Sequence, residues 1–320
     1  MALRLFMGID GGQSSTTVLV GDARGKIIGT ARGGPCNHVA STSLAEKFRS
    51  VVDDCVSRAC ESAGLDPARA CFEAVCCGMS GGPADKETHL REIIRSNHIL
   101  VTDDGVIALS GAMEGGPGIV VVSGTGSIAY GRNGSGRLMR AGGWGYIFGD
   151  EGGAFDIARQ ALRAVLRSEE GWGLPTSLRS SLLDEAGCAS ANDLLHLLYT
   201  PEWPRSRIAT FSALVDSVAE DGDQVARGIL EHAAQSLAML ASAIRRELFG
   251  PGEPAEVAYV GGVFRSRLLL ERFRMLIELE EGSRCVHPAR GPAAGALLEA
   301  YRAANLVVKL SQAPGLKEPC

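Results

Sequence analysis

Two short loops of glycine and hydroxyl residues could hold the oxygens of a phosphate chain. The first is Asp10-Gly11-Gly12-Gln13-Ser14, and the second is Gly124-Thr125-Gly126-Ser127. Backbone N–H groups can close on a phosphate where side chains are small, and a carboxylate at a strand end can hold a divalent cation. Each loop alone could equally be an ordinary hairpin turn. Together they favour a polyphosphate held between two similar domains.

The segments on both sides of each loop have strand character. Leu5–Ile9 and Thr16–Val20 flank the first loop, and Gly118–Ser123 and Ile128–Gly131 flank the second. A turn and a third strand follow each time, so the same order occurs twice and indicates an internal repeat. Chance similarity of short segments is the alternative. A P-loop or a dinucleotide-binding loop opens a helix, so both are excluded here.

A pair of acids, Asp103-Asp104, follows the expected strand Ile99–Thr102. A carboxylate at a strand terminus that faces a crevice can act as a base on a hydroxyl attacking a γ-phosphorus. Asp is also a preferred N-cap residue, so capping of a helix is the alternative. One acid of the pair can cap while the other acts, and the residue types do not decide which.

Glycine-rich segments supply two further candidate sites. Gly142-Gly143-Trp144-Gly145 is followed by Gly149-Asp150-Glu151-Gly152. A tryptophan between glycines has little reason to pack in a core, and carboxylates accept hydrogen bonds from sugar hydroxyls. A tight turn before an acidic helix start is the alternative. Val260-Gly261-Gly262-Val263 suits either a flat ring lying on the backbone or an ordinary strand-to-helix turn.

The composition is that of a globular protein with room for two domains. The chain has 320 residues, 45% hydrophobic and 22% charged, against a usual domain size of about 150 residues. A net charge of −5 and 5% aromatic residues argue against nucleic-acid binding. No apolar run reaches the roughly 18 residues of a membrane span, and no signal peptide precedes Asp10, so the cytoplasm is expected. The nine cysteines form no C-x-x-C pair and are expected to be mostly core residues.

Further elements are expected from the spacing of apolar residues. The remaining expected strands are Lys26–Ala31, Phe72–Gly78, Leu138–Ala141 and Val257–Val260. The expected helices are Ser43–Ala63, Lys86–Ser96, Phe155–Leu166, the long stretch Ile208–Phe249, Arg267–Glu280 and Gly291–Ala304.

In this order, the motifs resemble those of the acetate and sugar kinase/Hsp70/actin superfamily. Within it the chain is similar to the BadF/BadG/BcrA/BcrD-type ATPase family, and there to the N-acetylglucosamine kinases. Each motif is weak alone, but the ordered set spans nearly the whole chain. The matching pieces are Gly8–Ser14, Pro35–His38, Met79–Gly82, Thr102–Asp104, Ser123–Ser127, Gly142–Gly145, Gly149–Gly153 and Val260–Ser266.

The resemblance implies an α/β fold of two ribonuclease-H-like, actin-like ATPase domains around a central cleft. We expect one domain at residues 1–114 with a returning helix at 291–305, the other at 115–290, and a tail at 306–320. ATP and Mg²⁺ are the implied cofactors. A small-molecule sugar is the implied substrate, and a homodimer is the implied assembly.

The resemblance also implies roles, position by position. Asp104 matches the base on the sugar 6-hydroxyl, because the second acid of the family pattern is catalytic, and Asp10 matches the residue that positions Mg²⁺. The implied ATP contacts are Gly11, Gly12, Gln13, Ser14, Gly124, Thr125, Gly126 and Ser127 for the phosphates, and Gly261 and Gly262 for the adenosine. The implied sugar contacts are Asn37, Ser80, Gly81, Asp104, Gly143, Trp144 and Asp150.

The chain departs from the family pattern at two points. Gln13-Ser14 stands where the animal enzyme has Gly-Thr, which we expect to be harmless, and Val263 follows the paired glycines, so contacts with the base can differ. The implied reaction is ATP-dependent phosphorylation of the 6-hydroxyl of an amino sugar. N-acetylglucosamine and glucosamine are not separated by these residues.

Two other functions are alternatives. Some family members are ATPase activators that act on a partner enzyme and bridge a [4Fe–4S] cluster, with a cysteine near the second phosphate loop. This chain has no cysteine between Cys77 and Cys188, so that neighbourhood is empty. A sugar-binding sensor without chemistry is disfavoured by the presence of both Asp10 and Asp104.

Overall fold

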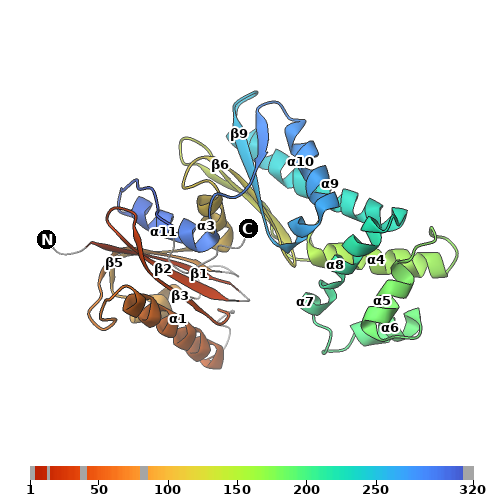
Figure 1. The fold of residues 1–320 in the computed structure, drawn as a ribbon, viewed down its shortest axis with the longest axis horizontal. Coiled ribbons are helices and arrows are strands. Elements are labelled where there is room, and N and C mark those ends of the chain that lie inside the picture. Colours follow the sequence, from red (N-terminus) through yellow and green to blue (C-terminus); the bar gives the residue numbers. More distant parts are fainter. Residues whose placement is uncertain (1–3, 13–14, 37–41, 80–85, 313–320) are drawn as a thin grey trace. The chain divides into compact units, whose positions relative to one another are not determined.

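The computed structural model describes residues 4–12, 15–36, 42–79 and 86–312. The chain divides into two compact units, one from residues 1–117 and 287–320 and the other from residues 118–286 (Figure 1). In the described part of the chain, no helix is both long and apolar enough to cross a membrane.

The first unit contains a five-stranded mixed sheet with the order β3-β2-β1-β4-β5. The central strand β1 pairs antiparallel with β2, which pairs antiparallel with β3, whereas β4 and β5 continue parallel to β1. The strands are β1 (Leu5–Gly11), β2 (Thr16–Asp22), β3 (Ile27–Gly33), β4 (Phe72–Met79) and β5 (Ser96–Asp103).

Helices cover both faces of this sheet (Figure 1). Successive side chains of a strand point to opposite faces, so Met7 packs with Phe48 of α1 while Phe6 packs with Leu297 of α11. Helix α3 packs along α11. The helices of this unit are α1 (Thr42–Ser62), α2 (Glu87–Ile93), α3 (Asp104–Ala112) and α11 (Pro292–Ala303).

The second unit repeats the strand order of the first. Its five-stranded sheet runs β10-β9-β6-β7-β8, with β7 and β8 antiparallel and β9 and β10 parallel to the central strand β6. This equivalence confirms the internal repeat inferred from the sequence. The strands are β6 (Gly118–Ser123), β7 (Ser127–Arg132), β8 (Leu138–Gly142), β9 (Ala255–Val260) and β10 (Ser283–Val286).

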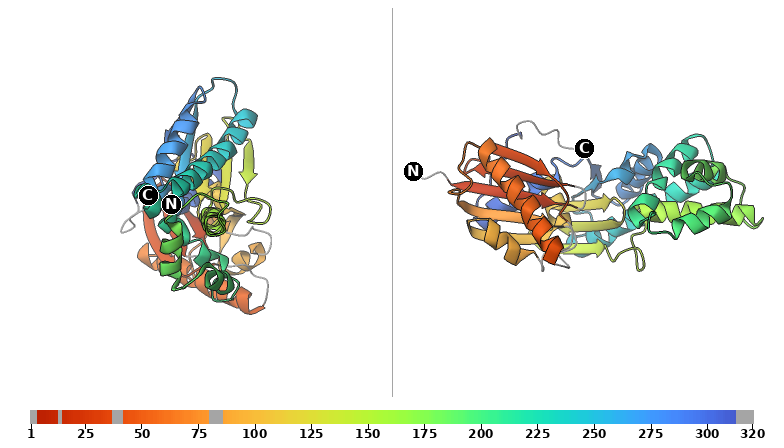
Figure 2. Two further views of the ribbon diagram at one scale, coloured as in Figure 1. Left: turned by 90° about the vertical axis from the view of Figure 1, so that its right-hand side faces the viewer. Right: turned by 90° about the horizontal axis from the view of Figure 1, so that it is seen from below.

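The helices of the second unit fall into two groups. Helices α9 (Gln224–Leu248) and α10 (Arg267–Glu278) lie side by side (Figure 2), and α9 packs on the sheet. A short 3₁₀ helix, η1 (Gly262–Arg265), precedes α10. The other helices, green in Figure 1, pack on one another and are α4 (Ala154–Glu169), α5 (Leu178–Ala186), α6 (Ala191–Leu198), α7 (Arg205–Ile208) and α8 (Phe211–Glu220).

Several expected boundaries were wrong. The stretch Ile208–Phe249 is divided at Gly222, whose φ is 101°, and Asp223 then caps α9 by accepting a hydrogen bond from the backbone of Ala226. Helix α2 ends at Ile93, so Ser96 already belongs to the next strand. The expectation for the cysteines holds for most of those described: Cys36, Cys55, Cys60, Cys76, Cys77 and Cys285 are buried.

Candidate functional site

Asp10 and Asp104 lie at the same edge of the first sheet. Strands β1, β4 and β5 are parallel, and their register places Asp10 opposite Gly78 and Gly78 opposite Thr102. Two strand spacings separate β1 from β5, roughly 10 Å. Asp104 begins α3 two residues after Thr102. The register thus carries both carboxylates to the end of the sheet where the parallel strands finish.

The two carboxylates interact. Burial and, to a smaller extent, the negative charge of Asp104 raise the pKa of Asp10 to about 7, and the guanidinium of Arg32 opposes both effects. A divalent cation would relieve this repulsion, and Mg²⁺ is usually bound through one or two carboxylates together with phosphate oxygens and waters. No group of three His, Cys, Asp or Glu side chains that could hold a metal occurs among the described residues. The Asp10 carboxylate, buried beside a second negative charge, fits a cation that takes its remaining ligands from a nucleotide and water.

Asp103 and Asp104 occupy different positions at the start of α3. Asp103 stands at the N-cap position, but its side chain makes no capping hydrogen bond, and Asp104 is in the first turn. The charge that acts on Asp10 is that of Asp104. Of the two acids, Asp104 is therefore the one whose charge reaches Asp10.

The described part of the first phosphate loop is anchored by backbone hydrogen bonds. The N–H of Gly12 donates to the carbonyl of Ser15, and the N–H of Cys36 donates to the carbonyl of Gly12, both at 3.0 Å. The fully buried Lys86, which sequence reasoning did not select, acts electrostatically on the Cys36 thiol. Five predicted contacts lie outside the described residues: Gln13, Ser14, Asn37, Ser80 and Gly81.

The second phosphate loop closes the β6–β7 hairpin. The N–H of Gly124 donates to the carbonyl of Gly126 at 3.0 Å. The hydroxyl of Ser127 is turned inward and donates to the carbonyl of Glu151 at 2.6 Å, whereas Thr125 is exposed. Thr125 is therefore better placed than Ser127 to offer a hydroxyl to a phosphate, and Ser127 holds the loop in place.

Two other predicted sites lie against this loop. The N–H of Gly143 donates to the carbonyl of Ser127 at 3.1 Å. Gly261 has a φ of 116°, and a Cβ there would overlap the carbonyl oxygen of Ser123, so only glycine fits. The ends of β6 and β9 thus bring the predicted phosphate, sugar and adenosine contacts of this unit together.

Trp144 projects away from the core, as its glycine neighbours suggested. Its side chain is 67% exposed, and the guanidinium of Arg140 lies 4.8 Å from the ring centroid. The residues that follow, Tyr146, Ile147 and Phe148, are exposed as well. This apolar, glycine-flanked surface suits the flat face of a sugar ring.

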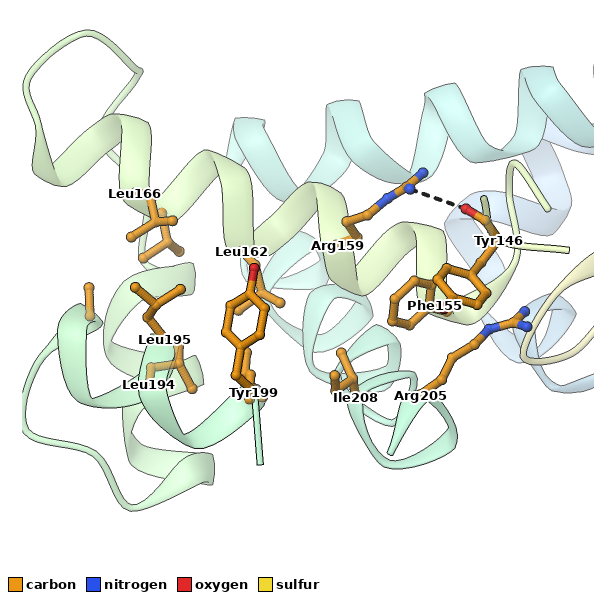
Figure 3. A pocket seen from close by; sticks show the side chains of 13 residues that line it. Tyr146, Phe155, Arg159, Leu162, Leu166, Leu194, Leu195, Tyr199, Arg205 and Ile208 are labelled. Atoms are coloured by element: carbon orange, nitrogen blue, oxygen red, sulfur yellow. Dashed lines mark hydrogen bonds between the residues drawn. The ribbon is translucent and has the colours of Figure 1, made fainter. Parts of the chain in front are cut away.

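Asp150 is buried and has a partner that sequence reasoning missed. Its carboxylate accepts a hydrogen bond from Nη2 of Arg205 at 2.5 Å. Arg205 lines a cavity of about 500 Å³ together with Tyr146 and Phe155 (Figure 3). Arg205 lies 55 residues from Asp150 in the chain, so no local sequence pattern predicts this ion pair.

The glycine at position 126 supports a stability prediction. A Cβ there would overlap the Asp150 carboxylate and stand 2.9 Å from Nη2 of Arg205, so Gly126→Ala must displace the ion pair. We expect a free energy of unfolding lower by about 1–3 kcal/mol, measured by chemical denaturation. Gly124→Ala is the matched control, because no atom lies within 4 Å of the added methyl group. Equal stability of the two variants would contradict the described packing.

Comparison with known proteins places the chain among sugar kinases. Residues 7–300 match the model of the BadF/BadG/BcrA/BcrD ATPase family. An N-acetylmuramic acid/N-acetylglucosamine kinase of Clostridium acetobutylicum is 33% identical over 87% of this chain and 91% of that protein. An N-acetyl-D-glucosamine kinase of Dictyostelium discoideum is 27% identical over 93% of this chain and 98% of that protein.

A solved structure shares the fold. The structure of a candidate N-acetylglucosamine kinase from Chromobacterium violaceum matches with a TM-score of 0.74 and 26% identity, over 93% of this chain and 99% of that chain. The expected α/β fold class with two mixed sheets is confirmed by the strand topology and by this match.

Proposed function

Because this chain belongs to the BadF/BadG/BcrA/BcrD ATPase family, we propose that it is an ATP-dependent kinase of amino sugars that phosphorylates the 6-hydroxyl of N-acetylglucosamine. The observation that carries the proposal is the interaction of Asp10 with Asp104 at one sheet edge. One acid next to a cation position and a second acid that faces an acceptor hydroxyl are what a phosphoryl transfer requires.

The first unit supplies the acid–base chemistry. Asp104 orients the 6-hydroxyl of the sugar and takes its proton as the oxygen attacks the γ-phosphorus. The carboxylate of Asp10 holds Mg²⁺ with the nucleotide, and the metal when bound neutralises charge on the phosphates. The first loop, to which Gly11 and Gly12 belong, lets the phosphates approach the backbone because its glycines carry no side chains.

The second unit supplies the remaining contacts. Gly124 and Gly126 let phosphate oxygens approach the backbone of the second loop, and Thr125 donates a hydrogen bond from its hydroxyl to them. Gly261 and Gly262 let the adenosine lie against the backbone. Asp150, Gly143 and Trp144 contact the sugar. We assign residues 1–114 with 291–305 and residues 115–290 as the two domains. We also propose the cytoplasm as the location, and, on the family resemblance, Mg²⁺ as the metal and a homodimer as the assembly.

A panel of acceptors tests the proposal. ADP formation is measured with N-acetylglucosamine, glucosamine, N-acetylmannosamine, glucose and no sugar. A positioned base contributes roughly 10²- to 10⁴-fold, so the rate with N-acetylglucosamine should exceed the sugar-free rate at least about 100-fold. A higher rate with glucosamine would make glucosamine the preferred acceptor and would still support a kinase of amino sugars. A flat response would contradict the kinase and favour an ATPase that acts on a partner protein or a sugar sensor.

N-acetylmuramic acid is a second candidate acceptor. The Clostridium relative carries both N-acetylmuramic acid and N-acetylglucosamine in its name, and it is 33% identical to this chain. The same coupled assay with N-acetylmuramic acid decides this point, because a bulky ether substituent on the sugar needs space that N-acetylglucosamine does not.

A further inference from the structure

Arg205 lies next to two of the predicted sites, the sugar contact Asp150 and the second phosphate loop. Its Nη2 donates to the Asp150 carboxylate at 2.5 Å, and the Asp150 side chain is 9% exposed against 32% for Arg205. The Asp150 carboxylate and the Arg205 guanidinium also occupy the space that a Cβ at Gly126 would need. The ion pair therefore touches a predicted sugar contact and the second phosphate loop at once.

The guanidinium is held firmly in this place. It lies 5.0 Å from the ring centroid of Tyr146 and 5.5 Å from that of Phe155, and these rings meet edge to face at 5.4 Å (Figure 3). A cation over aromatic faces is attracted by the ring quadrupoles. Its Nε is buried without a hydrogen-bond partner among the described residues.

The backbone around Asp150 is anchored independently of Arg205. The hydroxyl of Ser127 donates to the carbonyl of Glu151 at 2.6 Å, and the hydroxyl of Ser123 donates to the carbonyl of Gly152 at 2.9 Å. The N–H of Gly153 donates to the carbonyl of Asp150 at 3.0 Å. Arg205 therefore determines the orientation of the Asp150 carboxylate rather than the path of the loop.

We propose that Arg205 is a positioning residue for the acceptor sugar, which holds the Asp150 carboxylate in the orientation in which its remaining lone pairs accept hydrogen bonds from sugar hydroxyls. This inference rests on the proposed kinase activity. The pair's charge-assisted hydrogen bond uses one carboxylate oxygen, Oδ2, and leaves Oδ1 for the sugar. Loss of the guanidinium should therefore weaken sugar binding selectively.

The test compares Arg205→Gln, Arg205→Lys and the control Arg207→Gln by steady-state kinetics. Arg207 is on the same short helix and also stacks on an aromatic ring, 3.9 Å from the centroid of Trp203, but it bonds the carbonyl of Glu202. We expect Arg205→Gln to raise the KM for N-acetylglucosamine about tenfold or more, with the KM for ATP within about twofold. Arg205→Lys should recover part of the loss, and Arg207→Gln should match the wild type.

A double-mutant cycle separates positioning from support of the fold. If Arg205 acts through Asp150, Asp150→Asn with Arg205→Gln should raise the sugar KM no further than Asp150→Asn alone. Additive effects, an unchanged sugar KM, or a parallel rise of the sugar and ATP KM values with a lower thermal midpoint would each overturn the proposal. A wild type that phosphorylates no sugar would refute the kinase itself and this inference with it, whereas an active wild type with an unaffected Arg205→Gln variant refutes only the inference.

Discussion

Replacing Asp104 with asparagine is expected to reduce sugar phosphorylation by about 10³-fold while nucleotide binding persists. The amide keeps the shape of the side chain but cannot take the proton of the attacking hydroxyl. The loss should appear in kcat, because the proton is transferred only as the reaction proceeds. Steady-state ADP formation with N-acetylglucosamine gives kcat, and calorimetry with a non-hydrolysable ATP analogue gives the nucleotide affinity.

Asp103→Asn is the matched control for this experiment. Asp103 precedes Asp104 directly, at the N-cap position of α3, and makes no capping hydrogen bond with its side chain. We expect Asp103→Asn to retain activity within a few-fold of the wild type. The reverse result, a normal Asp104→Asn and an inactive Asp103→Asn, would reassign the base to the neighbouring acid.

Much of the fold follows from local sequence patterns. Alternating and β-branched runs predict the strands of both hairpins, and Gly118–Ser123 has the bounds that the sequence suggested. The repeat is visible in the sequence because each sheet begins with the same order of strands. What the sequence could not supply is the pairing of β4 and β9 with the central strands, since parallel partners are far apart in the chain.

The missed elements have physical explanations. Helix α3 is apolar on all sides, and its residues from Gly105 to Ala112 are buried, so it lacks the polar face that marks a helix in a sequence. Strand β10 has four residues and lies at a sheet edge. The division between α8 and α9 was signalled by Gly222-Asp223, a helix-ending glycine followed by an N-cap residue, and could have been recognised.

The candidate site, like the fold, could be predicted from the sequence only in part. The glycine loops and the strand-end acids are local motifs and can be found in the sequence. The partner of Asp150 cannot, because Arg205 lies on α7, and three other helices separate α7 from Asp150 in the chain. The interaction of Asp10 with Asp104 depends on the register of three strands, so its effect on the pKa of Asp10 emerges only in the fold.

Replacing Asp10 with asparagine is expected to stabilise the metal-free protein at alkaline pH and to abolish metal-dependent turnover. Burial and the charge of Asp104 raise the pKa of Asp10 from an ordinary 3.8 to about 7. A carboxyl group with a raised pKa in the folded state holds its proton more tightly there than in the unfolded chain. Stability is therefore lost as the pH rises from about 4 to about 7, and the loss is complete above pH 7.

The size of the effect follows from the same shift. At pH 8 the ionised Asp10 costs the folded protein about 4 kcal/mol at most, and partial solvation reduces that figure. Asp10→Asn removes this cost, so its advantage over the wild type should be largest at pH 8 and vanish near pH 4. Urea denaturation in EDTA at several pH values measures it. Asp53→Asn, an exposed acid on α1, should show no such pH-dependent difference.

Added Mg²⁺ should make the wild type more stable than Asp10→Asn at pH 8, because only the wild type keeps the carboxylate that binds the cation. Because a proton and the cation compete for the same carboxylate, the Mg²⁺ concentration needed for half-maximal activity of the wild type should rise as the pH falls below about 7. Asp104→Asn removes the neighbouring negative charge and lowers the pKa of Asp10, which should move that rise to lower pH for Mg²⁺-dependent nucleotide binding. An Asp10→Asn variant that is less stable than the wild type at pH 8 without metal would contradict the raised pKa of Asp10, and one that keeps normal Mg²⁺-dependent turnover would show that Asp10 does not hold the cation.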